Sequence, residues 1–288
     1  MLQVARLAPR TLGESAPRVA DFIHAQRAHD GGFRDRAGRS DLYYTVFGIE
    51  ALVALHEDLP APSLAAYLRS FGDGAGLDLV HAACLARAWA TLPPLFREGA
   101  PVDAIAARIA AHRSTDGGFA PRTGDSDGTA YALFLAVGAL QDLARPLPPA
   151  PELLAALERM RSDDGGYANQ AGASSGLTPP TAAAATLQRQ LGVPADPALG
   201  RWLLARAHEE GGFFAAPGAP MPDLLSTATA LHALSGGHAD LEPLREANLD
   251  FVDTLWSSRG GFFGHWADDT LDCEYTYYGL LALGHLSL

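Results

Sequence analysis

Apolar and polar positions along the 288-residue chain alternate between two kinds of helical stretch. The first kind has apolar residues on one face only, which is the spacing of an amphipathic helix. The second kind is rich in Ala, Leu and Gly with few charges, so a helix formed from it must be buried nearly all round. Amphipathic helices are predicted at Val19–Arg27, Val102–His112, Glu152–Arg161, Leu199–Ala207 and Ala247–Trp256. Buried helices are predicted at Tyr44–Leu55, Thr129–Leu140, Thr181–Leu191, Thr227–Leu234 and Thr276–Leu286.

A Gly-Gly-aromatic triplet ends each amphipathic stretch. The triplets begin at Gly31, Gly117, Gly165, Gly211 and Gly260. A degenerate copy at residues 71–74 follows the helical stretch Pro62–Arg69 and fills the wide gap after the first triplet. The glycine pair is expected to supply the positive φ angles that stop a helix and turn the chain. The spacing therefore predicts about six copies of a two-helix repeat.

The way to bury six apolar helices is to place them in an inner ring within an outer ring of amphipathic helices. We therefore expect an all-α fold, a closed α/α toroid in which residues 1–288 form a single domain. An open helical array is the alternative, because repeats of this kind also stack without closing.

Composition restricts the class of protein further. Hydrophobic residues make up 48% of the chain and charged residues 19%, which allows a large core and excludes a disordered chain. The longest apolar stretches, such as Tyr131–Leu140, are too short for a transmembrane segment, and no signal peptide is recognised. Two cysteines, Cys84 and Cys273, make no disulfide framework, so a cytoplasmic location is expected. The net charge of −12 argues against binding to nucleic acid.

Aligning the copies on the threonine that opens each apolar helix separates common acids from unusual ones. An aspartate stands four residues earlier in most copies, which predicts helix N-caps at Asp41, Asp78, Asp125, Asp223 and Asp272. Two residues before the threonine, only Asp127 and Glu274 are acidic. These two acids therefore have no counterpart in the other copies.

The Gly-Gly-Phe turns and the helices that follow them resemble the α/α toroid of protein prenyltransferase β subunits and of class II terpene and squalene–hopene cyclases. The resemblance is carried by the segments Phe22–Phe33 and Gly31–Gly48 and covers nearly the whole chain. It implies an isoprenoid or another apolar small molecule as the ligand.

In the β subunits zinc is bound by an Asp-x-Cys pair and by a histidine of the next copy. No copy of this chain has Asp-x-Cys, and only His81 fits the histidine position. His81 and Cys84 lie on one helix face, but two ligands are too few for zinc, which is therefore not expected. Asp272 and Glu274 would suit a hard cation such as Mg²⁺ if they bind metal at all.

Class II cyclases are similar to this chain at Asp125-Ser126-Asp127-Gly128-Thr129. The resemblance makes Asp127 the general acid that protonates an alkene, with Asp125 raising its pKa or fixing the donated proton. Gly128 departs from the family pattern, which has a third aspartate there. A double acidic cap of the following helix is the alternative role for these two acids.

Further residues are predicted to bind substrate. Aromatic faces stabilise cations and shape apolar cavities, although aromatic residues at helical spacing also serve as plain core. The predicted substrate-binding residues are Tyr43, Tyr44, Phe47, His81, Tyr131, Glu274, Tyr275 and Tyr278.

The favoured function is that of a class II cyclase-like enzyme that cyclises or isomerises a prenyl substrate with Asp127 as the acid. One alternative is a prenyltransferase β-subunit-like enzyme that lacks the usual zinc ligands and acts with a helical protein partner. The other is a non-catalytic toroid that binds lipid or serves as a scaffold.

Overall fold

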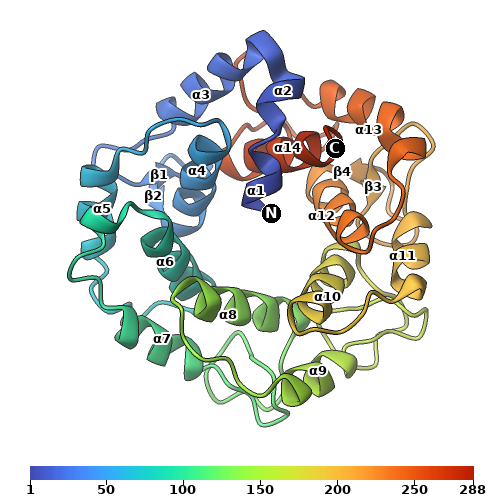
Figure 1. Ribbon diagram of the computed structural model, residues 1–288, viewed down its shortest axis with the longest axis horizontal. Coiled ribbons are helices and arrows are strands. Elements are labelled where there is room, and N and C mark those ends of the chain that lie inside the picture. Colours follow the sequence, from blue (N-terminus) through green and yellow to red (C-terminus); the bar gives the residue numbers. More distant parts are fainter.

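The computed structural model describes residues 1–288 and confirms the predicted all-α toroid (Figure 1). The inner ring contains α4 (Leu42–Ala54), α6 (Leu79–Thr91), α8 (Ala130–Asp142), α10 (Thr178–Gln190), α12 (Leu224–Gly236) and α14 (Cys273–His285). The outer ring contains α3 (Ala16–Ala25), α5 (Ala61–Arg69), α7 (Val102–Ala110), α9 (Ala150–Glu158), α11 (Pro197–Leu204) and α13 (Glu242–Thr254).

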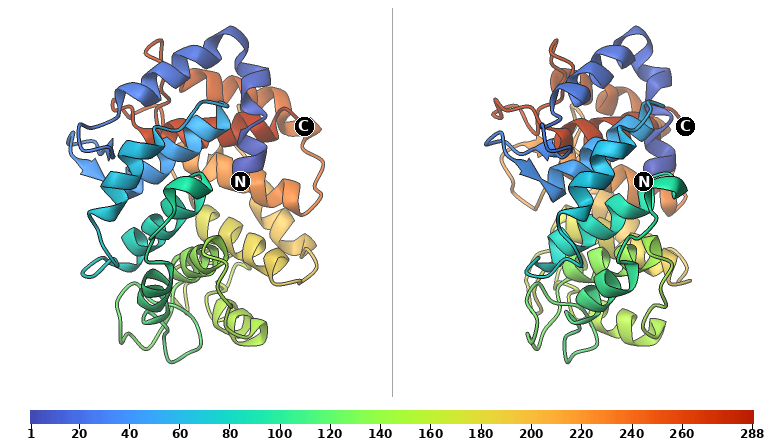
Figure 2. Two further views of the ribbon diagram at one scale, coloured as in Figure 1. Left: turned by 60° about the vertical axis from the view of Figure 1, so that its left-hand side comes forward. Right: turned by 90° about the vertical axis from the view of Figure 1, so that its left-hand side faces the viewer.

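Shorter elements complete the chain, and the first of them lies against inner helices α14 and α4 (Figure 1). Before the first repeat lie α1 (Leu2–Ala5), α2 (Ala8–Leu12) and the 3-10 helix η1 (Gly13–Ser15), and a second 3-10 helix, η2, spans Pro94–Phe96. Two antiparallel hairpins are formed by β1 (Phe33–Arg34) with β2 (Ser40–Asp41), and by β3 (Phe213–Phe214) with β4 (Pro222–Asp223). Both chain termini lie at one end of the ring, the terminal end, and the hairpins lie at the other, the loop end (Figure 2).

The first and last repeats are neighbours in space. Each inner helix packs against the next one along the chain, and α14 packs against α4. In the outer ring, the last turn lies on α3, where a Cβ placed on Gly260 would come within 2.2 Å of the carbonyl oxygen of Arg18. The chain in this structure is therefore a closed ring and not an open array.

The two glycines of a triplet have different roles. The first has a positive φ in every triplet, +94° at Gly211 for example, as the turn requires. The second glycine does not have a positive φ, except at Gly212. A glycine is needed at this second position because the next outer helix lies too close for a side chain. A Cβ on Gly166 would lie 2.5 Å from the Trp202 ring. The predicted positive φ is thus confirmed for the first glycine and wrong for most second glycines.

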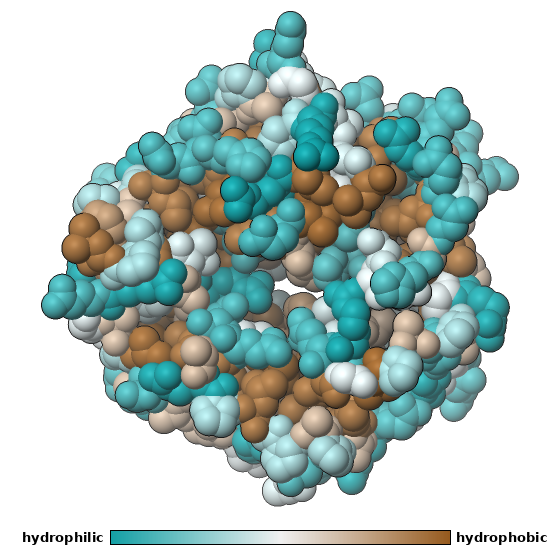
Figure 3. All heavy atoms as spheres, viewed as in Figure 1, coloured by the Kyte–Doolittle hydropathy of each residue, from teal (hydrophilic) through white to brown (hydrophobic).

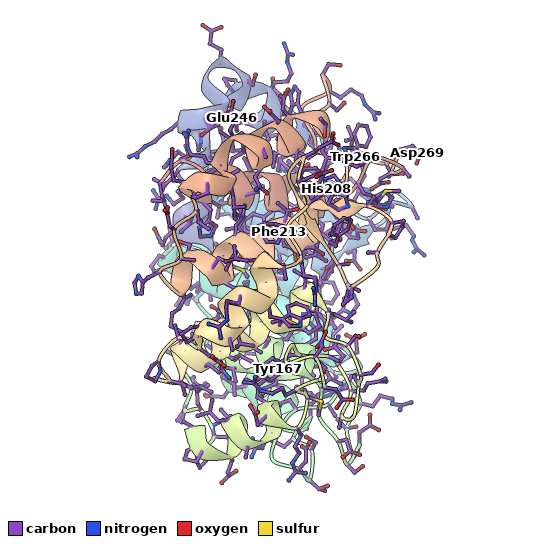
Figure 4. All side chains as sticks on the ribbon, turned by 90° about the vertical axis from the view of Figure 1, so that its right-hand side faces the viewer. Tyr167, His208, Phe213, Glu246, Trp266 and Asp269 are labelled. Carbon is purple, nitrogen blue, oxygen red and sulfur yellow. The ribbon has the colours of Figure 1, made fainter.

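The threonine near the start of the inner helix ties that helix to the turn before it. The backbone N–H of Phe33 donates to Thr45 Oγ1 at 2.9 Å, and Thr45 Oγ1 donates to the carbonyl of Asp41 at 2.6 Å. Equivalent bonds to the turn join Tyr167 to Thr181, Phe213 to Thr227 and Phe262 to Thr276. The aromatic side chains themselves are buried, and Figure 4 marks the positions of Tyr167 and Phe213.

Aspartate caps place most inner helices. Asp41, Asp78, Asp223 and Asp272 each accept a backbone N–H in the first turn, which confirms the predicted N-caps. The capped helices begin directly after these aspartates, a few residues before the predicted starts. The third inner helix differs, because its N-cap is Thr129, whose Oγ1 accepts from the N–H of Ala132 at 3.0 Å. The cap predicted at Asp125 is therefore wrong.

None of the helices combines the length and the apolar character that crossing a membrane requires.

Candidate functional site

The inner ring encloses a cavity of about 310 Å³ that is lined mainly by apolar and aromatic side chains. Its lining comes from the inner helices, including Val46 of α4, Phe134 of α8 and Thr229 of α12. On the face seen in Figure 3, hydrophilic residues gather around a central opening of the ring. This cavity has the apolar lining and the volume typical of small-molecule sites.

Aromatic rings from α4 and α14 form one wall of the cavity. The Phe47 ring centroid lies 4.9 Å from that of Tyr43 and 5.5 Å from that of Tyr278. Tyr131 of α8 lines the same cavity. Because the faces of such rings carry partial negative charge, this wall can stabilise a cation.

A carboxyl group and a phenol meet at the loop end of this wall. The hydroxyl of Tyr43, at the start of α4, donates to Glu274 Oε1, at the start of α14, at 2.6 Å. Burial raises the pKa of Glu274 to about 7, although the Tyr43 hydrogen bond and Arg36 oppose that rise. Tyr43 lines the cavity itself, so it lies between the carboxyl group and any molecule bound there.

Charged residues lie farther along the same cavity, toward the terminal end. Arg87 of α6 donates through Nε to Asp142 Oδ2 of α8 at 2.9 Å, and its Nη1 lies 3.6 Å from Glu50 Oε1 of α4. Burial raises the pKa of Glu50, and the charge of Arg87 partly opposes this. All three side chains line the cavity.

The structure brings together half of the predicted substrate-binding residues. Tyr43, Phe47, Tyr131 and Tyr278 line the cavity. Contrary to the prediction, the other four lie outside its lining: Tyr44, His81, Glu274 and Tyr275. Of these, Glu274 reaches the cavity through Tyr43, whereas Tyr275 packs under Arg36, whose guanidinium carbon lies 5.3 Å from the ring centroid.

Asp127 does not lie where a general acid is needed. It is exposed in the loop before α8, where its carboxylate accepts from the Ser126 hydroxyl at 2.6 Å. Asp125 pairs with Arg122 in the same loop at 3.3 Å. Neither acid lines the cavity, and neither caps α8. A general acid must reach the molecule bound in the cavity, so the structure contradicts both predicted roles of these acids, as proton donor and as helix cap.

The predicted metal ligands are engaged elsewhere. Asp272 accepts from Arg36 Nε at 2.6 Å and from the N–H of Tyr275, and Glu274 is held by Tyr43. Burial raises the pKa of Cys84 to about 12, so it is not a thiolate ligand at neutral pH. No group of three His, Cys, Asp or Glu side chains is arranged to hold a metal ion.

His81 joins two inner helices. Its Nδ1 lies 2.8 Å from Asp78 Oδ1 and its Nε2 lies 3.3 Å from Asp41 Oδ2, so its ring bridges the starts of α6 and α4. The hydrogen bond with Asp41, assisted by Asp78, raises the pKa of His81 to about 9 despite the opposing effect of burial. The imidazolium is therefore a structural ion pair and not a substrate contact.

This ion pair predicts a pH dependence of stability. Since the folded pKa is raised, the stabilisation is complete below the unfolded value near 6.5 and is lost as pH rises to about 9. We expect the free energy of unfolding of the wild type to fall by roughly 1 to 2 kcal/mol more than that of His81→Gln over this pH range, after allowing for solvent screening. Urea unfolding at several pH values measures this, with the exposed His29→Gln as a control that retains the wild-type pH dependence.

The sequence analysis missed three charged residues of the cavity, Glu50, Arg87 and Asp142, although a signal was present for the first two. Glu50 and Arg87 are isolated charges within otherwise apolar helices, and each stands the same distance after the capping aspartate of its helix. A charge at the same position of two neighbouring buried helices indicates that the two side chains meet, as they do here.

Comparison with known structures shows the same fold in enzymes of isoprenoid chemistry. The type II terpene cyclase MstE from Scytonema is 13% identical, with a TM-score of 0.64 over 96% of this chain and 98% of that chain. A variant of MstE solved with geranylgeranyl dihydroxybenzoate as substrate gives a TM-score of 0.65 at 14% identity, over 97% of each chain. Protein geranylgeranyltransferase-I from Candida albicans, complexed with GGPP, gives 0.52 at 14% identity, over 99% of this chain and 83% of that chain.

No curated protein shows significant sequence similarity to the chain. Its sequence does match a family model, that of the prenyltransferase alpha-alpha toroid domain, over residues 12–84 and 183–287. The two matched segments hold the first and last repeats, which are the repeats that supply Tyr43 and Glu274. The chain therefore belongs to the prenyltransferase alpha-alpha toroid domain family.

Proposed function

We propose that this protein is an enzyme that protonates a prenyl chain in the central cavity and so cyclises or isomerises it. The observation that carries the proposal is the Tyr43–Glu274 pair, a carboxyl group with a pKa near 7 joined to a phenol that lines an aromatic cavity. Membership of the family and the likeness in fold to a type II terpene cyclase support the substrate class.

Glu274 is the proton source in this proposal, and Tyr43 delivers the proton. When Glu274 is protonated, its O–H can donate to the Tyr43 oxygen, which directs the phenolic proton toward the cavity. Tyr43 then gives its proton to the alkene and takes the proton of Glu274. A new C–H bond forms, the alkene π bond breaks, and a carbocation and a Glu274 carboxylate remain.

The aromatic wall then supports the cation. Phe47, Tyr278 and Tyr131 present rings to the cavity, where they stabilise positive charge without capturing it as a nucleophile would. Attack by a second double bond closes a ring, and loss of a proton from the final cation gives the product. That proton restores the protonated acid, so the cycle needs no oxidant or reductant.

The proposal requires Glu274 in its protonated form. With a pKa near 7, this form predominates below neutrality and disappears at alkaline pH. Turnover is therefore expected to decline as pH rises through about 7. An ionised carboxylate as the active form would give the opposite profile.

Product analysis in deuterated water tests the proposal. The purified protein would be incubated with the alcohols and diphosphates of geranyl, farnesyl and geranylgeranyl chains, with and without Mg²⁺. Protonation of an alkene by an exchangeable acid places one deuterium from solvent on carbon in the product. Products without deuterium, or no consumption of any of these compounds, would count against the proposal.

Binding without conversion is the second candidate function. It is favoured by the position of Asp127, because the acid that matches the cyclase motif is exposed and does not line the cavity. Native mass spectrometry that finds a bound lipid unchanged after long incubation would support this second candidate.

A further inference from the structure

The phenol of Tyr277 lacks a hydrogen-bond partner. Tyr277 belongs to α14, exposes only 1% of its surface and lines the central cavity. Its hydroxyl oxygen is buried and has no partner at hydrogen-bonding distance and angle; the neighbouring Glu50 carboxylate approaches it without completing such a bond. A buried polar group without a partner destabilises a folded protein, so its presence at a cavity wall indicates a partner outside the chain.

The groups around this hydroxyl are polar in an otherwise apolar cavity. Glu50 lies close enough for its charge to raise the pKa of the Tyr277 phenol, in addition to the larger effect of burial. Arg87 donates one N–H to Asp142 and still exposes 34% of its side chain. Since Arg87 also lines the cavity, its remaining N–H groups are available to a bound molecule.

The charge of this region is balanced. The Met1 amino group also lines the cavity, where burial lowers its pKa and favours the neutral amine. Arg87 then contributes one positive charge, and Asp142 accepts its Nε–H directly. Burial favours the neutral form of the second acid, Glu50, by raising its pKa. A highly charged group such as a diphosphate would lie beside two acids with a single arginine that is already paired. An uncharged oxygen can accept hydrogen bonds here without that repulsion.

We infer that Tyr277, Arg87 and Glu50 form a subsite for an uncharged oxygen group, a hydroxyl or a carbonyl, at the end of an apolar chain. The inference rests on the proposed function only for the prenyl nature of that chain. Tyr277 and Arg87 donate to the ligand oxygen, and the apolar wall covers the hydrocarbon part. Prenyl alcohols, prenylated phenols and prenylated quinones belong to this class, and prenyl diphosphates do not.

The subsite also fixes the direction in which a chain binds. Tyr43 and Glu50 both belong to α4, where their separation along the helix axis is about 10 Å. A ligand with its oxygen at Tyr277 extends its hydrocarbon chain toward Tyr43 and Glu274 at the loop end. The double bonds of the chain, and not the oxygen group, are then presented to the acid.

A binding experiment tests the subsite without requiring turnover. Isothermal titration calorimetry would compare farnesol, farnesyl diphosphate and the hydrocarbon farnesene on wild type, on Tyr277→Phe and on Tyr67→Phe. We expect wild type to prefer farnesol over both other ligands. Tyr277→Phe is expected to lower the affinity for farnesol about tenfold and to leave farnesene unchanged. Tyr67 is a buried tyrosine of the outer helix α5 outside the cavity, so its variant should bind as wild type does.

Thermal unfolding of the free protein gives an independent measurement. Because the Tyr277 hydroxyl is unpartnered, Tyr277→Phe is expected to raise the Tm of the free protein by a few degrees. A lower Tm would mean that the hydroxyl is already bonded within the protein, and would overturn the inference. Tighter binding of the diphosphate, or equal affinities of wild type and Tyr277→Phe for farnesol, would also overturn it.

These outcomes are separable from those of the proposed function. Farnesol that binds through Tyr277 but is never converted would support the subsite and contradict the enzymatic proposal. Deuterated products, together with an affinity for farnesol that Tyr277→Phe does not change, would support the enzymatic proposal and contradict the subsite.

Discussion

Replacing Glu274 by Gln is expected to reduce product formation by about 100-fold or more, which is the usual contribution of a general acid. Glutamine keeps an acceptor for the Tyr43 hydroxyl at the same position, so the closure between α4 and α14 is preserved. It has no acidic proton to give, and protonation of an alkene cannot start. The variant is thus expected to remain folded and to lose catalysis.

Asp127→Asn is the matched control for this variant. Asp127 is exposed and lies outside the cavity, so its replacement is expected to leave turnover within the error of the measurement. Both variants would be assayed for kcat and KM across pH, with circular dichroism as a check of folding. If Asp127→Asn loses product and Glu274→Gln does not, the motif that resembles the cyclases contains the acid and our assignment is wrong.

Gly211→Ala is expected to destabilise the protein by roughly 4 kcal/mol or more, a loss reserved for the most disruptive single substitutions. Two effects add at this position. Gly211 has a φ of +94°, which an L-residue rarely adopts, and a Cβ there would come within 1.9 Å of the carbonyl oxygen of Ala247. The obstructing atom belongs to the backbone of α13, so no side-chain rotation relieves the clash.

Gly165→Ala separates these two effects. Gly165 is the first glycine of another triplet and has a φ of +87°, but no atom lies within 4 Å of the Cβ position. Its substitution is expected to lower the free energy of unfolding only through the unfavourable positive φ of alanine, by about 1 to 2 kcal/mol. Chemical denaturation of both variants compares the free energies of unfolding. Equal losses in the two variants would show that close approach to α13 adds nothing.

The repeat predicted much of the fold because its signals are local. A glycine with positive φ and an aspartate cap depend on a few consecutive residues, and they place the turns at Gly31 or Gly211 and the helix starts after Asp41 or Asp272. The hairpins and the lead-in helices α1 and α2 were not predicted, since their strands and turns are too short to leave a periodic pattern.

The candidate site was less predictable because it depends on contacts between distant residues. Comparison of repeat copies identified Glu274 as unusual, but its partner Tyr43 belongs to the opposite end of the sequence. Asp127 matched a motif of the cyclases, yet the motif did not determine that α8 would start only at Ala130 and leave the acid in an exposed loop. Similar sequence around an acid does not reproduce the buried position that a general acid in a cavity requires.

Closure of the ring determines the order in which parts of the chain are expected to fold. Contacts within a repeat, and between successive repeats, join residues close in sequence and form at a small cost in chain entropy. The contacts of α14 with α4, α1 and α2 join the two ends of the chain, so they are the most non-local contacts of the fold and are expected to form last. A chain with every repeat folded but the circle still open would have native helices and no Tyr43–Glu274 pair. Formation of the proton relay would then mark the final step of assembly.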